Sequence, residues 1–243
     1  ASQIVGVIKE FAILDLPFLF NSEKEVDAVM DGPIGKQLLD RLPAKNLIGL
    51  SWFEHGFRNL TNSKRPVQKL EDMQGLKVRV QQNSVAIDTF SALGTNAVPM
   101  PFPELYSALE QKAVDGQENP YTTVESAKLY EVQKYMSATK HSYTPLPLLM
   151  SKKFWDGLSA DEKKIIQDAA KEAAVYQRKA NREVDEKSMQ ALKAGGMQIT
   201  TIAPAEMDRI RAKVQPVVNK YSVQVGESLV KELFSEIEKV RKH

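Results

Sequence analysis

The sequence predicts an α/β protein built of two lobes, and three stretches carry this prediction. Between Gly75 and Pro120, segments that alternate polar and apolar residues are followed by segments of helical periodicity, as in consecutive α/β units. Residues 135–150 form a long extended segment that contains two prolines. Residues 160–194 are expected to form one unbroken helix, which at ~1.5 Å per residue is roughly 50 Å long. Because this length exceeds the width of a small domain, the helix is expected to bridge two lobes.

The composition excludes several classes of protein. A length of 243 residues suits one large or two modest domains, and 42% hydrophobic residues can build a core. The 33 basic and 31 acidic residues are dispersed along the chain, so no nucleic-acid partner is expected. The absence of cysteine excludes disulfides and thiolate sites. No apolar run approaches the ~20 residues of a membrane span, and no leader is recognisable, so the signal peptide of an exported protein would already be removed or lie outside this sequence.

The N-terminal part predicts a buried run, two helices and a strand. Residues 11–20 are too apolar to be exposed. Ser22 and Glu25 are expected to form a capping box for a first helix, and the Gly-Pro pair at 32–33 separates it from a second helix. Residues 47–53 are the first clear strand. Since an α/β lobe normally begins with a strand, we expect that an N-terminal piece of the first lobe is missing from this sequence.

The middle of the chain supplies further short strands that alternate with helices. These strands are predicted at residues 57–63, 77–80, 96–100 and 113–117. The first of them is expected to carry Arg58 outward. Gly94 ends one intervening helix, since glycine tolerates the left-handed conformation, and Pro103 begins the next as an N1 proline.

Two polar side chains lie at the carboxyl ends of predicted strands. Arg79 is near the exit of one strand, and Asn119 follows the end of another. Open α/β sheets bind ligands beyond such strand ends, and a guanidinium pairs a carboxylate through two parallel hydrogen bonds. Arg58 is a second candidate anion ligand. The alternative is an arginine paired with a neighbouring Asp or Glu, which is the commoner role, and the spacing does not decide between the two.

The C-terminal half is mostly helical. A helix is expected over residues 122–134, and the prolines confine the extended segment that follows to a sheet edge or a connection between lobes. Ser159 and Glu162 form a capping box at the start of the long helix, which ends at the glycine pair 195–196. A coiled coil is the alternative, but the helix lacks a sustained heptad seam. A last strand is predicted at residues 197–201, and residues 204–243 are predicted to be helical with breaks near Pro216 and Gly226.

Four motifs in this order resemble one known family. They are LDLPFLF at 14–20, WFEHGFR at 52–58 with LTNSKRP at 60–66, GLKVRV at 75–80, and VDGQENP at 114–120. They are similar to motifs of the dicarboxylate-type solute-binding proteins of tripartite ATP-independent periplasmic (TRAP) transporters, and the resemblance covers essentially the whole chain.

The resemblance implies a periplasmic-binding-protein-like fold, in which two α/β lobes joined by crossing strands close on a small organic acid. Lobe I would comprise residues 1–55 and 144–183, and lobe II residues 56–143 and 184–243. It further implies a periplasmic location, membrane permease subunits as partners, no cofactor and no direct membrane insertion. Members of the family carry a longer N-terminal part. If that part is absent, burial of residues 11–20 would need another chain or a rearrangement, such as a dimer or a swapped assembly.

The resemblance also implies roles for individual residues. Arg79 would pair with the ligand carboxylate, Asn119 would lie beside it, and Arg58 would be a second cation near the same group. Phe102 would form a wall of the site. The remaining candidates lie in or next to matching motifs: Asn83, Trp52 and Glu54. For Trp52 and Phe102, an ordinary core position is an equal alternative.

These observations predict capture of an organic acid without chemistry, followed by delivery to a TRAP permease. The alternative is a two-lobed α/β enzyme acting on a small carboxylate, with His55 and His141 as acid-base groups assisted by Asp115 or Glu118. The sequence contains no nucleophile elbow, phosphate loop or dinucleotide motif, and no metal-ligand spacing. A structural scaffold that uses the long helix for partner contacts is a third possibility, which does not explain arginines at strand exits. The identity of the acid is left open.

Overall fold

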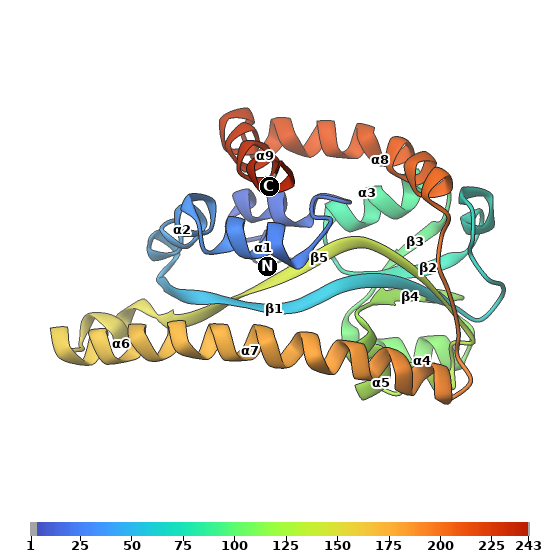
Figure 1. Cartoon of the computed structure of the whole chain (residues 1–243), viewed down its shortest axis with the longest axis horizontal. Helices are drawn as coiled ribbons and strands as arrows, with labels where there is room; N and C mark the ends of the chain where they lie inside the picture. Colours follow the sequence, from blue (N-terminus) through green and yellow to red (C-terminus); the bar gives the residue numbers. More distant parts are fainter. Residues whose placement is uncertain (1–3, 243) are drawn as a thin grey trace.

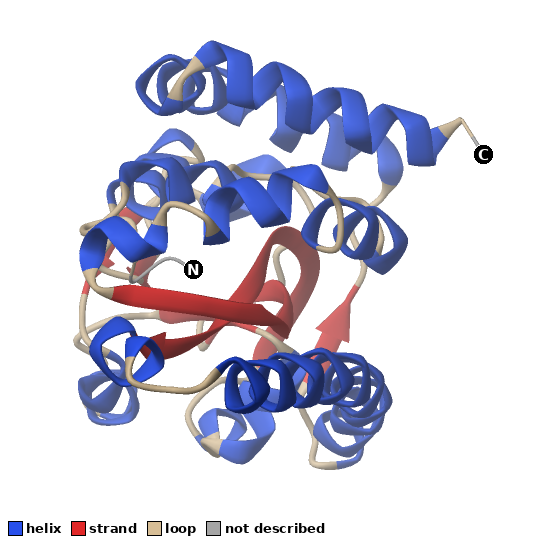
Figure 2. Ribbon diagram, turned by 90° about the vertical axis from the view of Figure 1, so that its left-hand side faces the viewer, coloured by secondary structure: helices blue, strands red, loops and turns tan. Residues whose placement is uncertain are grey.

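The computed structural model describes residues 4–242 and confirms the predicted α/β fold. One six-stranded sheet has the order β3-β2-β4-β1-β5-β6, and helices cover both of its faces (Figure 1, Figure 2). The strands are β1 (Leu47–Asn62), β2 (Lys77–Val80), β3 (Asn96–Pro99), β4 (Gly116–Asn119), β5 (Tyr135–Ser151) and β6 (Gln198–Thr200). The α-helices are α1 (Glu23–Met30), α2 (Pro33–Leu39), α3 (Ser84–Ala92), α4 (Leu105–Glu110), α5 (Tyr121–Ser126), α6 (Lys152–Asp156), α7 (Ala160–Ala194), α8 (Pro204–Val225) and α9 (Glu227–Arg241). Residues 1–3 and His243, which belong to the predicted lobes, lie outside the described residues.

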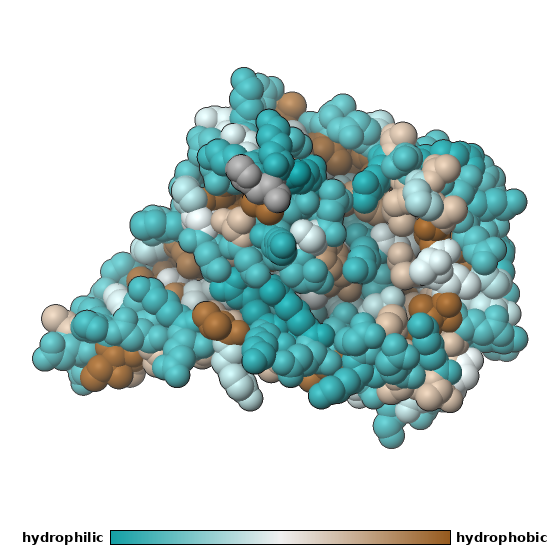
Figure 3. Space-filling model, in the orientation of Figure 1, coloured by the Kyte–Doolittle hydropathy of each residue, from teal (hydrophilic) through white to brown (hydrophobic). Residues whose placement is uncertain are grey.

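The sheet is asymmetric along its length. The short strands β2, β3 and β4 lie at one end, whereas β1 and β5 continue together to the other end (Figure 1). Helix α7 runs along one face of this pair and packs on β1 and α5, while α1, α8 and α9 cover the opposite face (Figure 1). The surface seen in Figure 3 is mostly hydrophilic, with scattered hydrophobic residues. The predicted crossing strands and long helix are therefore both present.

The strands predicted separately at 47–53 and 57–63 are one continuous strand, β1. Gly56 lies between them with a φ of +110°, and the register with β5 shifts there, as at a β-bulge. A bulge bends a strand without ending it, so the predicted interruption is wrong. The proline-containing part of β5 pairs with β1 only, since β6 contacts β5 only at Tyr135–Ser137. The expected edge position of these prolines is confirmed.

Replacing Gly56 by alanine is expected to destabilise the protein by about 1–3 kcal/mol, because a residue with a Cβ is strained at this backbone conformation. Lack of space is not the cause, since the nearest atom to the added Cβ would be Asn181 Nδ2 at 3.7 Å. Urea denaturation measures the effect. Gly157→Ala is the matched control, because φ there is −78° and an alanine is tolerated. Equal midpoints for the two variants would contradict the strain argument.

The apolar run at 11–20 is buried within its own chain. Its first half lies in a 3₁₀ helix at Lys9–Asp15, in which Phe11 and Ile13 are 0% exposed. The run packs in one cluster with residues of α8 and α9, among them Tyr221 and Leu233. The expectation that its burial would need another chain or a rearrangement is therefore wrong, because the C-terminal helices cover it.

The capping box of α7 is confirmed, whereas the one predicted for α1 forms only in part. The Ser159 hydroxyl accepts from the Glu162 N–H, and the Glu162 carboxylate accepts from the Ser159 N–H. At α1, Ser22 accepts from the Glu25 N–H, but the Glu25 carboxylate bonds to Asn21 instead, so only half of the predicted box forms.

Helix α8 continues through Pro216, where a break was predicted. The side chain of Pro216 is exposed, so the carbonyl that it leaves without a helical partner can face water. The predicted break at Gly226 is confirmed, because φ there is +121° and α9 begins directly after it. The helix predicted over residues 122–134 is shorter, since α5 ends at Ser126 and Lys128 adopts a φ of +53°.

Candidate ligand-binding cleft

A cleft of about 570 Å³ opens where the short strands end against the β1–β5 pair. Its volume lies within the ~300–1,000 Å³ typical of small-molecule sites. From the ends of the short strands and the turns after them come Arg79, Gln81, Gln82, Met100, Phe102 and Asn119. From β1 and β5 come His55, Arg58, Thr144, Leu146, Pro147 and Leu149. The cleft therefore lies at the predicted strand exits.

Arg79 brings a buried guanidinium to this cleft. It lies on β2 between β3 and β4, and only 4% of the residue is exposed. Its Nε donates to the Met100 carbonyl at 2.8 Å, and no Asp or Glu within residues 4–242 forms an ion pair with it. Burial lowers the pKa of Arg79, with a nearby Glu118 acting in the opposite direction, but a guanidinium stays protonated at neutral pH. The alternative of a structural ion pair does not apply to this arginine.

Arg58, by contrast, is paired with Glu118. Its Nε donates to Glu118 Oε2, and its Nη2 donates to Oε1 at 2.9 Å and to Asn119 Oδ1 at 3.0 Å. The prediction that Arg58 points outward is wrong, because helices cover both faces of β1 and the residue is 3% exposed. Burial by itself would raise the pKa of Glu118, but the Arg58 charge and the bonds from His141 and Arg58 lower it to about 2.

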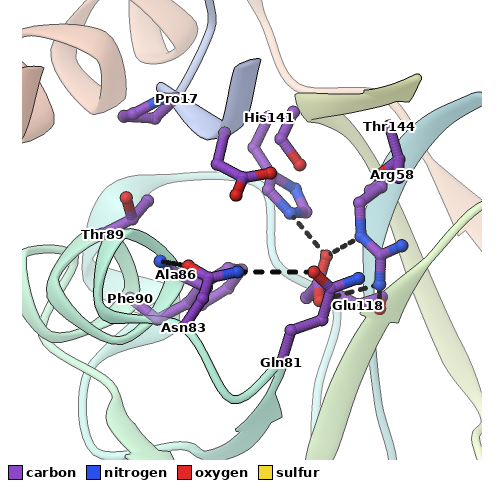
Figure 4. Close-up of a pocket in the computed structure, with 12 residues that line it drawn as sticks. Pro17, Arg58, Gln81, Asn83, Ala86, Thr89, Phe90, Glu118, His141 and Thr144 are labelled. Carbon is purple, nitrogen blue, oxygen red and sulfur yellow. Dashed lines mark hydrogen bonds and ion pairs between the residues drawn. The ribbon is translucent and has the colours of Figure 1, made fainter. Parts of the chain in front are cut away.

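A second, small cavity lies behind this ion pair. Figure 4 shows Arg58, Glu118 and His141 gathered beside Gln81 and Asn83. His141 Nε2 lies 3.1 Å from Glu118 Oε2, and its Nδ1 lies 2.8 Å from the Thr139 hydroxyl. The cavity volume is about 20 Å³, which is room for about one water molecule. This cavity cannot hold an organic ligand and instead separates the ion pair from the first turn of α3.

Three further predicted residues line the main cleft. Asn119 is buried beside Arg58, and its Nδ2 donates to Gln117 Oε1 at 2.5 Å. Asn83 caps α3 by accepting from the Ala86 N–H at 2.8 Å. Phe102 is 45% exposed, so it is not a core residue and instead forms part of the cleft lining. The structure thus brings Arg79, Arg58, Asn119, Asn83 and Phe102 together.

Trp52 and Glu54 do not line the cleft. Trp52 is a core residue that packs on Phe11 with ring centroids 5.9 Å apart and donates to the Gly35 carbonyl at 3.2 Å. Glu54 is 2% exposed and accepts from Arg182 Nη2 at 2.8 Å, which ties α7 to β1. Both residues belong to the motif that contains Arg58. Because helices cover both faces of β1, most of its side chains pack against those helices and do not reach the cleft.

Several lining residues were not among the predicted ligand-binding residues. Gln81 and Gln82 directly follow β2, so the strand-exit argument that selected Arg79 could have found them. Thr144 and Leu146 reach the cleft through the pairing of β5 with β1, which the sequence pattern did not specify. From the sequence, His55 is expected only as an acid-base group of the enzyme alternative.

The side chain of His55 is neutral at physiological pH. Its Nε2 lies 2.6 Å from the Thr123 hydroxyl, and both residues line the cleft. Burial, together with the Arg58 charge, lowers the pKa of His55 to about 4. His55 therefore offers the cleft a hydrogen-bonding ring without a charge.

The four residues proposed for acid-base chemistry in the enzyme alternative do not form one cluster in the structure. They are His55, His141, Asp115 and Glu118. His141 contacts Glu118, a coupling that the sequence did not reveal, but Glu118 is held by Arg58. Asp115 accepts from the Lys77 N–H at 2.9 Å and does not line the cleft. Within residues 4–242, no group of three or more acidic, His or Cys side chains is placed to hold a metal ion. None of the described helices is long and apolar enough to cross a membrane.

A family model and individual protein sequences both show that this chain is similar to bacterial solute-binding proteins. A family model described as bacterial extracellular solute-binding protein, family 7, matches residues 1–224. A solute-binding protein of Verminephrobacter eiseniae is 39% identical over 97% of this chain and 70% of its own length.

Solved structures with bound acids are also similar. The sugar acid binding protein of Advenella mimigardefordensis in complex with galactonate is 47% identical, with a TM-score of 0.95 over 98% of this chain and 77% of that chain. A TRAP periplasmic solute binding protein of a Polaromonas species bound to D-erythronate is 40% identical, with a TM-score of 0.91 over 96% of this chain and 76% of that chain.

Proposed function

Because the chain belongs to family 7 of the bacterial extracellular solute-binding proteins, we propose that it captures a small organic acid in the cleft beside Arg79. In the periplasm it then delivers this acid to the membrane permease of a TRAP transporter. The observation that carries the proposal is the buried Arg79 guanidinium, which forms no ion pair with any carboxylate of the described residues. Similar solved proteins hold galactonate and D-erythronate, which are both carboxylates.

The ligand carboxylate supplies the counter-ion that Arg79 lacks. A guanidinium in a site of low dielectric gains more from a carboxylate than the same group does in water, and its planar fork can make two parallel hydrogen bonds. Asn119 and Arg58 lie on the next strands of the sheet and complete the polar end of the cleft. Asn83 and Phe102 line it after β2 and β3.

Closure of two lobes around the acid would retain it without chemistry. The proposed lobes, residues 1–55 with 144–183 and residues 56–143 with 184–243, meet where Gly56 pairs with Thr144. The bulge at Gly56 is a suitable place for the crossing strands to bend. The ligand shifts the population towards the closed form only by its preference for that form.

A thermal-shift screen of organic acids tests this proposal. At a concentration of 100 Kd, a ligand should add about 2.7 kcal/mol of stability, which raises the Tm of a protein of this size by roughly 5–10 °C. The panel contains galactonate, D-erythronate, succinate and malate, with galactitol as the matched compound that lacks a carboxylate. Stabilisation by an acid but not by galactitol is expected. If no acid raises the Tm, or if galactitol raises it as much as galactonate does, the proposal fails.

A further inference from the structure

A bulge in β5 carries His141. Where the two long strands pair, a single residue of β1, Asn59, faces residues 138–141 of β5. The Asn59 Oδ1 accepts from the Lys140 N–H at 3.1 Å, and the His141 carbonyl accepts from the Phe18 N–H at 2.8 Å. A bulge changes the direction of the side chains that it carries, and these two bonds hold it in place. The backbone of His141 is therefore fixed by contacts with β1 and with the buried run at 11–20.

Phe90, Glu118 and Thr139 hold the ring of His141, and Figure 4 shows the first two of them. Phe90 packs edge-on against the ring, with centroids 5.1 Å apart and planes at 90°. His141 Nε2 lies 3.1 Å from Glu118 Oε2, and Nδ1 lies 2.8 Å from the Thr139 hydroxyl. All four residues are buried. Each ring nitrogen of His141 therefore faces a polar group of known chemistry.

The carboxylate of Glu118 determines where the ring carries its proton. With a pKa of about 2, Glu118 is ionised at neutral pH and can only accept hydrogen bonds, so His141 Nε2 is the donor. An imidazole with one N–H then has an acceptor at Nδ1, and the Thr139 hydroxyl donates to it. The Thr139 oxygen in turn accepts from the Leu60 N–H at 3.3 Å. Each bond from the backbone of β1 to the carboxylate therefore has a defined direction.

The same series of hydrogen bonds continues into the main cleft. Glu118 pairs with Arg58, whose Nη2 also donates to Asn119 Oδ1 at 3.0 Å. Asn119 Nδ2 donates to Gln117 Oε1 at 2.5 Å. An amide that is bonded through both its oxygen and its nitrogen cannot turn over without losing both bonds. The orientation of the Asn119 amide in the cleft therefore depends on Arg58, and through Arg58 on Glu118 and His141.

We propose that Thr139 is a positioning residue for the ligand site, because its hydroxyl donates to His141 Nδ1 and so keeps the proton-bearing Nε2 on Glu118. Glu118 in turn holds Arg58 and, through it, Asn119. This inference rests on the proposed function, since these residues are aligned for a bound acid. Thr139 is not among the residues that line the cleft, so it acts on the ligand only through His141.

A ring protonated on both nitrogens is the alternative. Asp15 lines the small cavity together with His141 and Glu118, and two carboxylates near the ring would favour an imidazolium. Nδ1 would then donate to the Thr139 hydroxyl, and this hydroxyl would no longer determine which nitrogen bears the proton. The two arrangements differ in the proton on Nδ1.

Nitrogen NMR at pH 7 distinguishes these arrangements without any ligand. The full-length protein is labelled with nitrogen-15 in its histidines, and the signals of His141 are identified by their absence from His141→Gln. The chemical shift of a ring nitrogen reports whether it carries a proton. Nε2 of His141 is expected to be protonated and Nδ1 unprotonated. A protonated Nδ1, with or without a proton on Nε2, overturns the proposal.

Thr139→Val tests the effect on binding, because it keeps the shape of the side chain but removes the hydroxyl. Nδ1 becomes a buried acceptor without its donor, so its chemical shift should change and the Kd for the bound acid should rise roughly tenfold. Thr139→Ser restores the hydroxyl and should restore both values. Ser137→Ala is the matched control, since it removes a buried hydroxyl from the same strand, bonded to the Val67 carbonyl at 2.7 Å. It should leave the Kd and the His141 signals unchanged.

The possible failures can be told apart by calorimetry with the acid that gives the largest thermal shift. If Thr139→Val binds this acid as tightly as the unaltered protein does, or if Ser137→Ala weakens binding equally, the role of Thr139 is overturned while capture of an acid stands. If no acid binds to the unaltered protein, the proposed function fails, and the role of Thr139 fails with it. If Thr139→Val does not fold, the nitrogen spectrum of the unaltered protein still decides the proposal.

Discussion

Arg79→Ala is expected to lose most of the affinity for the bound acid while the protein stays folded. Removing one partner of a desolvated charge pair costs about 2–5 kcal/mol, which corresponds to a roughly 30- to 4,000-fold higher Kd. The fold should tolerate the change, because within the described residues Arg79 forms no ion pair and its side chain makes one hydrogen bond, to the Met100 carbonyl. In the free protein, loss of a buried cation without a counter-ion should leave the Tm unchanged or raise it.

Calorimetry with the acid that gives the largest thermal shift measures this effect. Lys77→Ala is the control, since Lys77 lies on the same strand, is exposed and does not line the cleft. Arg79→Lys should bind with intermediate affinity, because it keeps the charge but loses the planar fork. Unchanged affinity in Arg79→Ala would remove the proposed role of this residue.

Glu118→Ala is expected to destabilise the protein by about 3–5 kcal/mol, since it leaves the Arg58 guanidinium buried without its carboxylate. Chemical denaturation measures the loss. The double variant Arg58→Met, Glu118→Leu is the control, because replacing both partners with apolar residues removes the uncompensated charge and should restore much of the stability. A single variant as stable as the unaltered protein would show that the pair contributes nothing.

The same ion pair predicts how stability depends on pH. The pKa of Glu118 is lowered from 4.5 to about 2 in the folded protein. A lowered pKa means that the folded state binds its proton more weakly than the unfolded state, so this stabilisation is fully present above the unfolded value. It should be lost as the pH falls through about 2. Denaturation midpoints between pH 5 and pH 2 should therefore fall more steeply for the unaltered protein than for the double variant.

Much of the site could be predicted from strand ends alone. Arg79 and Asn119 were found because a period-two pattern marks a strand, and the carboxyl ends of neighbouring parallel strands face a common crevice. The same rule, applied to the two residues that follow β2, also selects Gln81 and Gln82. By contrast, Trp52 and Glu54 were expected at the site from a motif match, and the structure buries both in packing layers.

The sequence by itself determined most of the strands and helices, the caps of α7 and the position of Arg79 at a strand exit, but not that β1 is one continuous strand. These features depend on local periodicity and on nearest neighbours in the chain, which a single sequence displays. Only the tertiary structure decided that Arg58 is neutralised by Glu118 and that α8 and α9 cover the run at 11–20. In both cases the partners are far apart in sequence, and their contact follows from how the chain packs, which no local pattern specifies.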